Sequence, residues 1–151
     1  MPLNRRKLLS LPYYIHYPYE RLTLTSGKGN KERVPYVSGL NWGQRPGRNQ
    51  DQAYISVPSH IQKSGFFPEI GEEFEIHTDD NEVWVCARRQ ANGKAIHTIN
   101  DNSIIGKYFR RRLGIEHGDL ITLDHLLRYG RTSVDIYKKT PNIFILDFKV
   151  Y

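Results

Sequence analysis

The chain contains a single cysteine, Cys86, among its 151 residues. No disulfide can form within it, a closed zinc site is not expected, and a cytosolic setting is favoured. No apolar run approaches the length that a membrane-spanning helix needs. Residues 1–10 are basic, but no apolar signal-peptide core follows them. We therefore expect a cytoplasmic protein that forms one globular domain without membrane contact.

Catalytic motifs are scarce as well. None of the six histidines is followed two residues later by lysine, so the H-x-K motif of phospholipase-D-type nucleases is missing. No two histidines lie four residues apart on a helix, and the phosphate-binding pattern G-x-x-x-x-G-K-[ST] is absent. We predict no metal site and no cofactor, and we expect no catalysis by the chain itself.

One acidic pattern keeps an enzymatic alternative open. Asp135, followed by Asp147 and Lys149, has the layout that many metal-dependent nucleases use to hold Mg²⁺ and activate water. Asp147 and Lys149 also alternate with Leu146 and Phe148, as polar residues do in a half-buried strand. The strand interpretation is favoured, and a compact Mg²⁺-dependent nuclease is the alternative function.

The charge that is present is mainly basic and unevenly placed. Lys and Arg total 22 against 16 acids, the net charge is +6, and the isoelectric point is about 9.5. Residues 86–112 hold seven basic residues and one acid, whereas residues 69–82 hold seven acids and no Lys or Arg. A basic balance favours a polyanionic partner, so we expect one part of the surface to meet nucleic acid. A basic module that binds RNA or a protein is a third possibility.

Two polar segments carry side chains that can recognise bases. Residues 38–52 contain three glycines and a proline, which predict a loop, together with several Asn, Gln and Arg side chains. Residues 88–94 have similar chemistry and lie between two predicted strands. Arg can form two parallel hydrogen bonds to guanine, and Asn or Gln can do so to adenine. Either segment alone is equally compatible with a solvated loop, but two of them on one basic domain favour DNA recognition.

The periodicity predicts a mainly β barrel or sandwich. Residues 103–112 are predicted to form a helix that begins near Asp101 or Asn102 and ends at Gly114, and residues 123–129 a second one, capped by Thr122 and closed by Gly130. The second helix exposes few side chains suited to bases, so a helix-turn-helix is disfavoured. Strands are predicted at residues 53–58, 74–78, 83–87, 95–98, 134–138 and 143–148, and a short helical turn at 59–64.

The N-terminal part differs in composition from the rest. Residues 11–19 are rich in aromatic residues and proline, which suits an extended segment packed on a neighbour, and residues 26–31 suggest a flexible basic linker. We therefore assign residues 1–33 to an N-terminal extension and residues 34–151 to the folded domain.

Several of these segments resemble one known family. Residues 38–49, 53–55 and 66–68 are similar to the B3-type DNA-binding domain of type II restriction endonucleases, in particular the NgoFVII-type family. Residues 93–96, 102–114, 128–132 and 146–148 share the resemblance, which covers roughly residues 34–148. It implies a seven-stranded pseudobarrel with two short α-helices, and two arms that grip double-stranded DNA in the major groove. The arms fall on residues 41–51 and 88–94, with the second one extending towards Asn102.

The same resemblance implies a division of labour. In that family a separate phospholipase-D-like nuclease domain accompanies the DNA-binding domain, and residues 1–33 are too short to provide one. We therefore expect the target-recognition part of a prokaryotic restriction enzyme, with a nuclease domain or subunit as its partner. We expect several of Lys94, Lys107, Arg110, Arg111 and Arg112 to contact phosphates, with packing on the helix as the alternative for Arg112 and some of the others. The predicted DNA-binding residues are Asn41, Trp42, Gln44, Arg45, Arg48, Asn49, Gln50, Asp51, Arg88, Arg89, Gln90, Asn92, Lys94, Asn102, Lys107 and Arg110.

Overall fold

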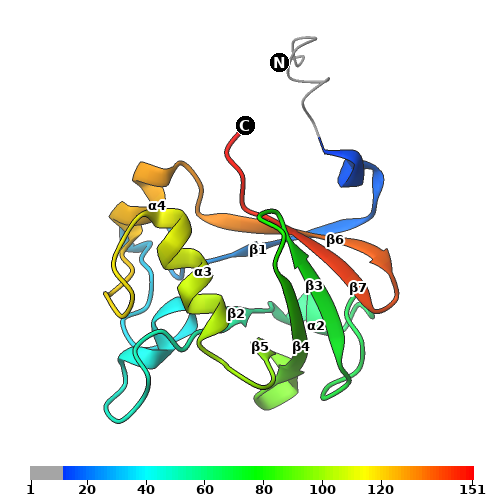
Figure 1. Ribbon diagram of the computed structural model, residues 1–151, viewed down its shortest axis with the longest axis horizontal. Coiled ribbons are helices and arrows are strands. Elements are labelled where there is room, and N and C mark those ends of the chain that lie inside the picture. The colour runs from blue at the N-terminus through cyan, green and yellow to red at the C-terminus, as the bar shows by residue number, and fades with distance from the viewer. Residues whose placement is uncertain (1–11) are drawn as a thin grey trace.

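Seven strands curl into one nearly closed barrel in the computed structural model, which describes residues 12–151 (Figure 1). The strand order is β1-β6-β7-β3-β4-β5-β2, and the two end strands β1 and β2 also contact each other. All neighbouring strands are antiparallel except β3 and β7. The strands are β1 (Tyr19–Thr23), β2 (Ile55–Ser56), β3 (Phe74–Thr78), β4 (Val83–Arg89), β5 (Ala95–Thr98), β6 (Ser133–Thr140) and β7 (Ile143–Asp147). The predicted seven-stranded pseudobarrel is confirmed.

Short helices lie outside the barrel wall. They are α2 (Ser59–Gln62), α3 (Ile104–Leu113) and α4 (Leu123–Tyr129), with 3-10 helices η1 (Tyr13–His16), η2 (Gly29–Lys31), η3 (Gly39–Gln44) and η4 (Ala91–Gly93). Helix α4 has the predicted bounds: the Thr122 hydroxyl accepts the His125 N–H, the His125 ring accepts the Thr122 N–H, and Gly130 closes the helix in the left-handed region. Helix α3 begins one residue later than predicted and ends at Gly114.

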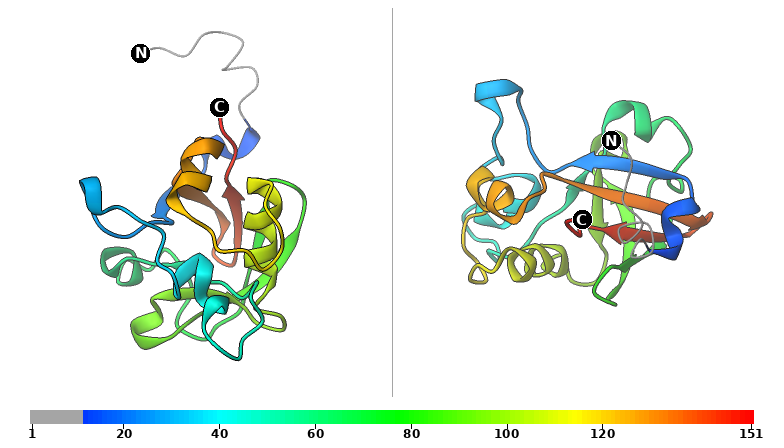
Figure 2. Two further views of the ribbon diagram at one scale, coloured as in Figure 1. Left: turned by 90° about the vertical axis from the view of Figure 1, so that its left-hand side faces the viewer. Right: turned by 90° about the horizontal axis from the view of Figure 1, so that it is seen from above.

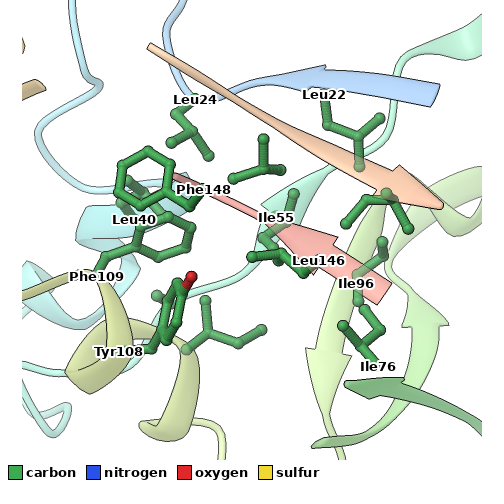
Figure 3. Packing of buried hydrophobic residues seen from close by; sticks show 14 of the residues in the cluster. Leu22, Leu24, Leu40, Ile55, Ile76, Ile96, Tyr108, Phe109, Leu146 and Phe148 are labelled. Atoms are coloured by element: carbon green, nitrogen blue, oxygen red, sulfur yellow. The ribbon is translucent and has the colours of Figure 1, made fainter. Parts of the chain in front are cut away.

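The core fills the barrel from both the strands and helix α3. Strand residues such as Leu22, Ile76 and Leu146 point inward, and α3 adds Tyr108 and Phe109, all of them fully buried (Figure 3). Burying one such side chain stabilises the fold by roughly 1.5–3 kcal/mol. The barrel is therefore a rigid base on which loops at its ends can be held in place.

The boundary that we assigned at residues 33/34 falls too late in the chain. Strand β1 pairs with β6, so that Leu22 lies opposite Val134, and Tyr14 packs on Tyr137 and Ile145. Residues 12–33 therefore include a wall strand of the barrel. The aromatic segment packs on a neighbouring strand as predicted, but Tyr13–His16 form a 3-10 helix where an extended segment was expected. The alternation of apolar and polar residues that includes Leu22 and Leu24 is short, and the unusual composition of this region made it hard to identify as a strand. Residues 1–11 of the assigned extension lie outside the described residues.

No helix within residues 12–151 is both long enough and apolar enough to cross a membrane.

Candidate nucleic-acid interface

The two polar segments lie at the same end of the barrel, the lower end in Figure 1 (see also Figure 2). The first arm, residues 41–51, continues from η3 into a loop, and the second arm, residues 88–94, is the tip of the β4–β5 hairpin. A cleft of about 420 Å³ lies between them. Its lining residues are Trp42, Arg45, Arg48, Tyr54, Arg89, Gln90, His97 and Asn102. Segments about 40 residues apart in the sequence thus form one surface.

An aromatic cluster forms the floor of this cleft. The rings of Tyr54 and His97 stack with centroids 5.4 Å apart, and the Trp42 ring meets both edge-on. The guanidinium of Arg48 lies 3.9 Å from the centroid of the Trp42 ring, in cation–π geometry. Arg48 also donates to the Gln52 side chain at 3.0 Å. The floor is therefore built from packed rings, and a cation lies over one of them.

His97 is held neutral in this cluster. Burial is the main cause that lowers its pKa from 6.5 to about 4, and the nearby charges of Arg89 and Arg48 contribute to the same shift. Its Nε2 lies 3.1 Å from the side-chain nitrogen of Gln90. Neither His97 nor Tyr54 was singled out from the sequence. A histidine as the only ionisable residue in the short strand Ala95–Thr98 was the signal that could have identified His97.

Exposure divides the predicted DNA-binding residues into three groups. The buried group contains Asn41, Asp51, Arg88 and Arg110, of which none is more than 7% exposed. The partly exposed group contains Trp42, Gln44, Asn102 and Lys107. The exposed group contains Arg45, Arg48, Asn49, Gln50, Arg89, Gln90, Asn92 and Lys94. Only the last two groups present side chains to a partner in this conformation.

Asn41 supports the first arm from inside. Its side-chain amide donates to the carbonyls of Pro35 (2.9 Å) and Ile121 (2.8 Å), and its oxygen accepts the Ile121 N–H (2.8 Å). A buried amide whose bonds are all made to backbone is fixed, and breaking them leaves polar groups unpaired. Asn41 therefore positions the arm, and its buried side chain gives the predicted base contact no support in this conformation.

Asp51 and Arg110 support the other end of the same arm. Asp51 accepts the Gly118 N–H at 2.8 Å and lies 3.4 Å from Nε of Arg110, which also donates to the Asp119 carbonyl at 2.9 Å. Helix α3 approaches so closely that a Cβ on Gly106 would lie 1.8 Å from the Asp51 carbonyl oxygen. Three residues of the loop between α3 and α4 therefore hold the first arm or its anchoring arginine through hydrogen bonds: Gly118, Asp119 and Ile121. We call this set the bracket. Asp51 and Arg110 thus anchor the arm, and both are buried in this conformation.

Arg88 has the corresponding role in the second arm. Its guanidinium donates to the Pro68 carbonyl (3.0 and 3.2 Å) and to the Gly93 carbonyl (3.3 Å), and the residue is 5% exposed. These bonds tie the hairpin tip to the loop before β3. Its neighbour Arg89 is exposed and lines the cleft. Of the two adjacent arginines, only Arg89 is placed to meet a partner.

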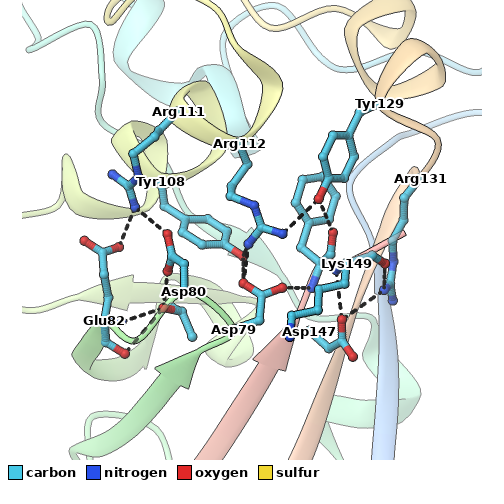
Figure 4. Close-up of polar contacts among 12 residues, drawn as sticks. Asp79, Asp80, Glu82, Tyr108, Arg111, Arg112, Tyr129, Arg131, Asp147 and Lys149 are labelled. Atoms are coloured by element: carbon cyan, nitrogen blue, oxygen red, sulfur yellow. Dashed lines mark hydrogen bonds and ion pairs between the residues drawn. The ribbon is translucent and has the colours of Figure 1, made fainter. Parts of the chain in front are cut away.

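The basic end of helix α3 is paired with acids of the β3–β4 turn (Figure 4). Arg111 bridges Asp80 and Glu82, both at 3.0 Å, and Arg112 pairs with Asp79 and donates to the Tyr129 hydroxyl at 2.9 Å. Ion pairs therefore connect the acidic segment, residues 69–82, with the basic segment, residues 86–112, in the folded protein. Arg112 thus packs within the fold, which is the alternative that the sequence left open for it, and Arg111 is engaged by two acids.

The acidic pair of the nuclease alternative is occupied by cationic and phenolic groups. Asp135 and Asp147 lie opposite each other on β6 and β7, and Arg131 reaches both, at 2.8 and 3.5 Å. Arg21 also pairs with Asp135 at 2.8 Å, and the hydroxyls of Tyr14 and Tyr151 donate to Asp147 (Asp147 and Arg131 appear in Figure 4). Their charge is thus balanced by arginine. Within the described residues, no group of three or more His, Cys, Asp or Glu is arranged to hold a metal ion.

The nearly closed seven-stranded barrel has the architecture of a B3-like pseudobarrel, with two polar segments at one end. Comparison with protein families agrees, because residues 17–140 match the NgoFVII C-terminal B3-like DNA-binding domain. The match spans well over half of the chain, which therefore belongs to this family. It makes DNA the partner of this domain. No curated protein matches the sequence.

Proposed function

We propose that this domain binds double-stranded DNA in a sequence-specific manner, with both arms in the major groove. The observation that carries the proposal is the cleft between the arms, which is lined by Arg45, Arg48, Arg89, Gln90 and Asn102. The major groove is about 12 Å wide and presents a distinct pattern of donors and acceptors for each base pair. Arg, Gln and Asn are the side chains that match these patterns with paired hydrogen bonds.

The geometry of the arginines suits base recognition. Arg45 uses its Nε to donate to the Val37 carbonyl at 2.8 Å, which leaves its two terminal nitrogens for an acceptor pair such as O6 and N7 of guanine. Arg48 is oriented by the Trp42 ring beneath it. Side chains that are held in place before binding lose less conformational entropy when the complex forms. We assign base contacts mainly to this cleft, and phosphate contacts to exposed cations around it such as Lys94.

We further propose that the domain is the target-recognition part of a type II restriction system. The acidic pair that could have served a nuclease, Asp135 and Asp147, is tied to Arg131 and Arg21 and connects barrel strands. Strand cleavage would then depend on a separate nuclease domain or subunit, which this domain directs to its site.

The test is a selection from random DNA duplexes at one fixed salt concentration. We expect one sequence to be enriched, and we expect Arg45→Ala and Arg48→Ala each to relax the preference at a single base pair, at a cost of about 1–3 kcal/mol in specific binding. Arg128→Ala is the matched control, because Arg128 lies on α4, outside the cleft, and pairs with Asp124. Enrichment of no sequence, or equal binding of duplex RNA, would contradict the proposal.

A further inference from the structure

Gln90 has an unusual backbone conformation at the edge of the cleft. Its φ is 67° and its ψ is 179°, a region that is populated almost entirely by glycine. A non-glycine residue persists in such a conformation only when surrounding contacts hold it there. The side chain supplies one of them, because its amide nitrogen lies 3.1 Å from Nε2 of His97. The position of this side chain is thus determined by the protein.

The partner ring is itself fixed. His97 is 6% exposed, stacks on Tyr54 with an interplanar angle of 18°, and meets the Trp42 ring at 88°. It lies on β5 opposite Ala87 of β4, in the barrel wall. Packing on these sides leaves the imidazole little freedom to turn. Nε2 of His97 is therefore a fixed point to which a side chain at the hairpin tip can be hydrogen-bonded.

The hydrogen bond determines which atoms of Gln90 face the cleft. An amide nitrogen can only donate, so Nε2 of His97 must accept, and the proton of the neutral imidazole is on Nδ1. One amide hydrogen of Gln90 is used in this bond. When the hydrogen trans to the carbonyl oxygen makes this bond, the other hydrogen and the carbonyl oxygen lie side by side on the opposite edge of the amide. A donor next to an acceptor is the pattern that matches N7 and the N6 amino group of adenine.

We propose that His97 is a positioning residue that fixes the amide of Gln90 for recognition of adenine at one base pair of the target. The inference rests on the proposed function and adds a base identity to it. Without the acceptor on His97, the amide of Gln90 is free to rotate, and the opposite orientation presents its donor and acceptor in the wrong order. Specificity at this base pair then depends on a residue that does not itself touch DNA.

A first experiment uses the free protein. Long-range ¹H–¹⁵N NMR spectra at neutral pH distinguish the two neutral tautomers of His97 from the charged form. We expect the neutral tautomer with its proton on Nδ1. A proton on Nε2, or a charged ring, would overturn the assignment without any reference to DNA binding.

A second experiment selects target sequences with variants. His97→Phe keeps a ring on Tyr54 but removes the acceptor, and Gln90→Ala removes the amide. We expect both variants to lose preference for adenine at the same base pair by roughly 10- to 100-fold, and the double variant to lose no more than either single variant. His16→Phe, the same change at an exposed position on η1, should retain the wild-type preference.

The outcomes separate this inference from the proposed function. A wild-type protein that enriches no duplex would overturn the proposed function and this inference with it. A wild-type consensus that His97→Phe leaves unchanged would overturn the inference alone. Loss of preference at different base pairs in the two variants would also overturn it, because the two side chains would then act separately.

Discussion

Neighbouring polar residues on these arms have opposite roles, and burial is what separates them. Arg88 is 5% exposed and donates to two backbone carbonyls, whereas Arg89 is exposed and lines the cleft. A buried guanidinium must keep its hydrogen bonds because an unpaired buried charge is strongly unfavourable. We therefore interpret Arg88 as part of the scaffold and Arg89 as part of the DNA-binding surface.

His97 leads to a prediction about stability and pH. In the folded protein, burial and the charges of Arg89 and Arg48 lower its pKa from 6.5 to about 4. Between about pH 6.5 and pH 4, His97 is therefore protonated in the unfolded chain but not in the folded chain. The free energy of unfolding consequently falls as the pH is lowered through this range. We expect a loss of roughly 3 kcal/mol at most from this one group.

Urea unfolding of the wild type and of His97→Phe, measured from about pH 7 to about pH 4, checks this prediction. As the pH falls, the free energy of unfolding of the wild type should decrease more than that of His97→Phe. The exposed His16→Phe variant should follow the wild type. A difference that is independent of pH would show that His97 is not kept neutral by the fold.

At the scale of elements, the loop between α3 and α4 controls the shape of the first arm. It has no regular structure of its own, yet Gly118, Asp119 and Ile121 make hydrogen bonds to the arm or to the arginine that anchors it. Since both ends of the arm are held, only its middle, residues 45–50, is uniformly exposed. The bracket thus limits the conformational entropy that the arm can lose when it binds.

Asn41→Ala tests the bracket. The change leaves the partly buried carbonyl of Pro35 and the buried N–H and carbonyl of Ile121 without their partner, and each stranded buried group costs about 1–3 kcal/mol. We expect a lower midpoint of urea unfolding and, in addition, weaker specific binding because the arm is displaced. Asn30→Ala, at an exposed position on η2, is the matched control and should change neither. Full stability of Asn41→Ala would contradict the assigned supporting role.

Across the whole molecule, pairing between distant segments decides where positive charge is available. The acids of the β3–β4 turn meet Arg111 and Arg112 at the upper end of the barrel in Figure 1, away from the arms. Burial alone would raise the pKa of Asp80, but hydrogen bonds from Thr78 and Arg111 keep it below its usual value. Exposed cations at the arm end, such as Arg89 and Lys94, are therefore the better candidates for DNA contact.

The salt dependence of DNA binding tests this distribution. Each phosphate contact contributes about one unit to the slope of log K against log salt. Because we assign Lys94 to phosphate contacts and Arg89 to base contacts, the double substitution Arg89→Ala/Lys94→Ala should flatten the slope by about one unit. Arg111→Ala should leave the slope unchanged. A flatter slope for Arg111→Ala would place α3 in the interface after all.

Local patterns were sufficient to predict most elements. Helix α4 and strands β3 and β5 have their predicted bounds, because caps and alternation are encoded within a few residues. Strand β1 was missed because its alternation is short and its pairing partner, β6, lies more than 100 residues away. The two arms were located as polar, glycine-containing segments between strands. Their exposed residues, however, could not be distinguished from their buried ones.

The sequence by itself thus determined the class of the fold, the positions of the arms and the chemistry that they carry. Only the tertiary structure decided which polar side chains face a partner and which hold the arms. Asn41 is satisfied by Ile121, which is 80 residues away, and Gln90 is oriented by His97 in the next strand. The physical reason is that burial and hydrogen-bond pairing depend on neighbours brought together by the fold, whereas caps, turns and alternation depend on neighbours in the chain.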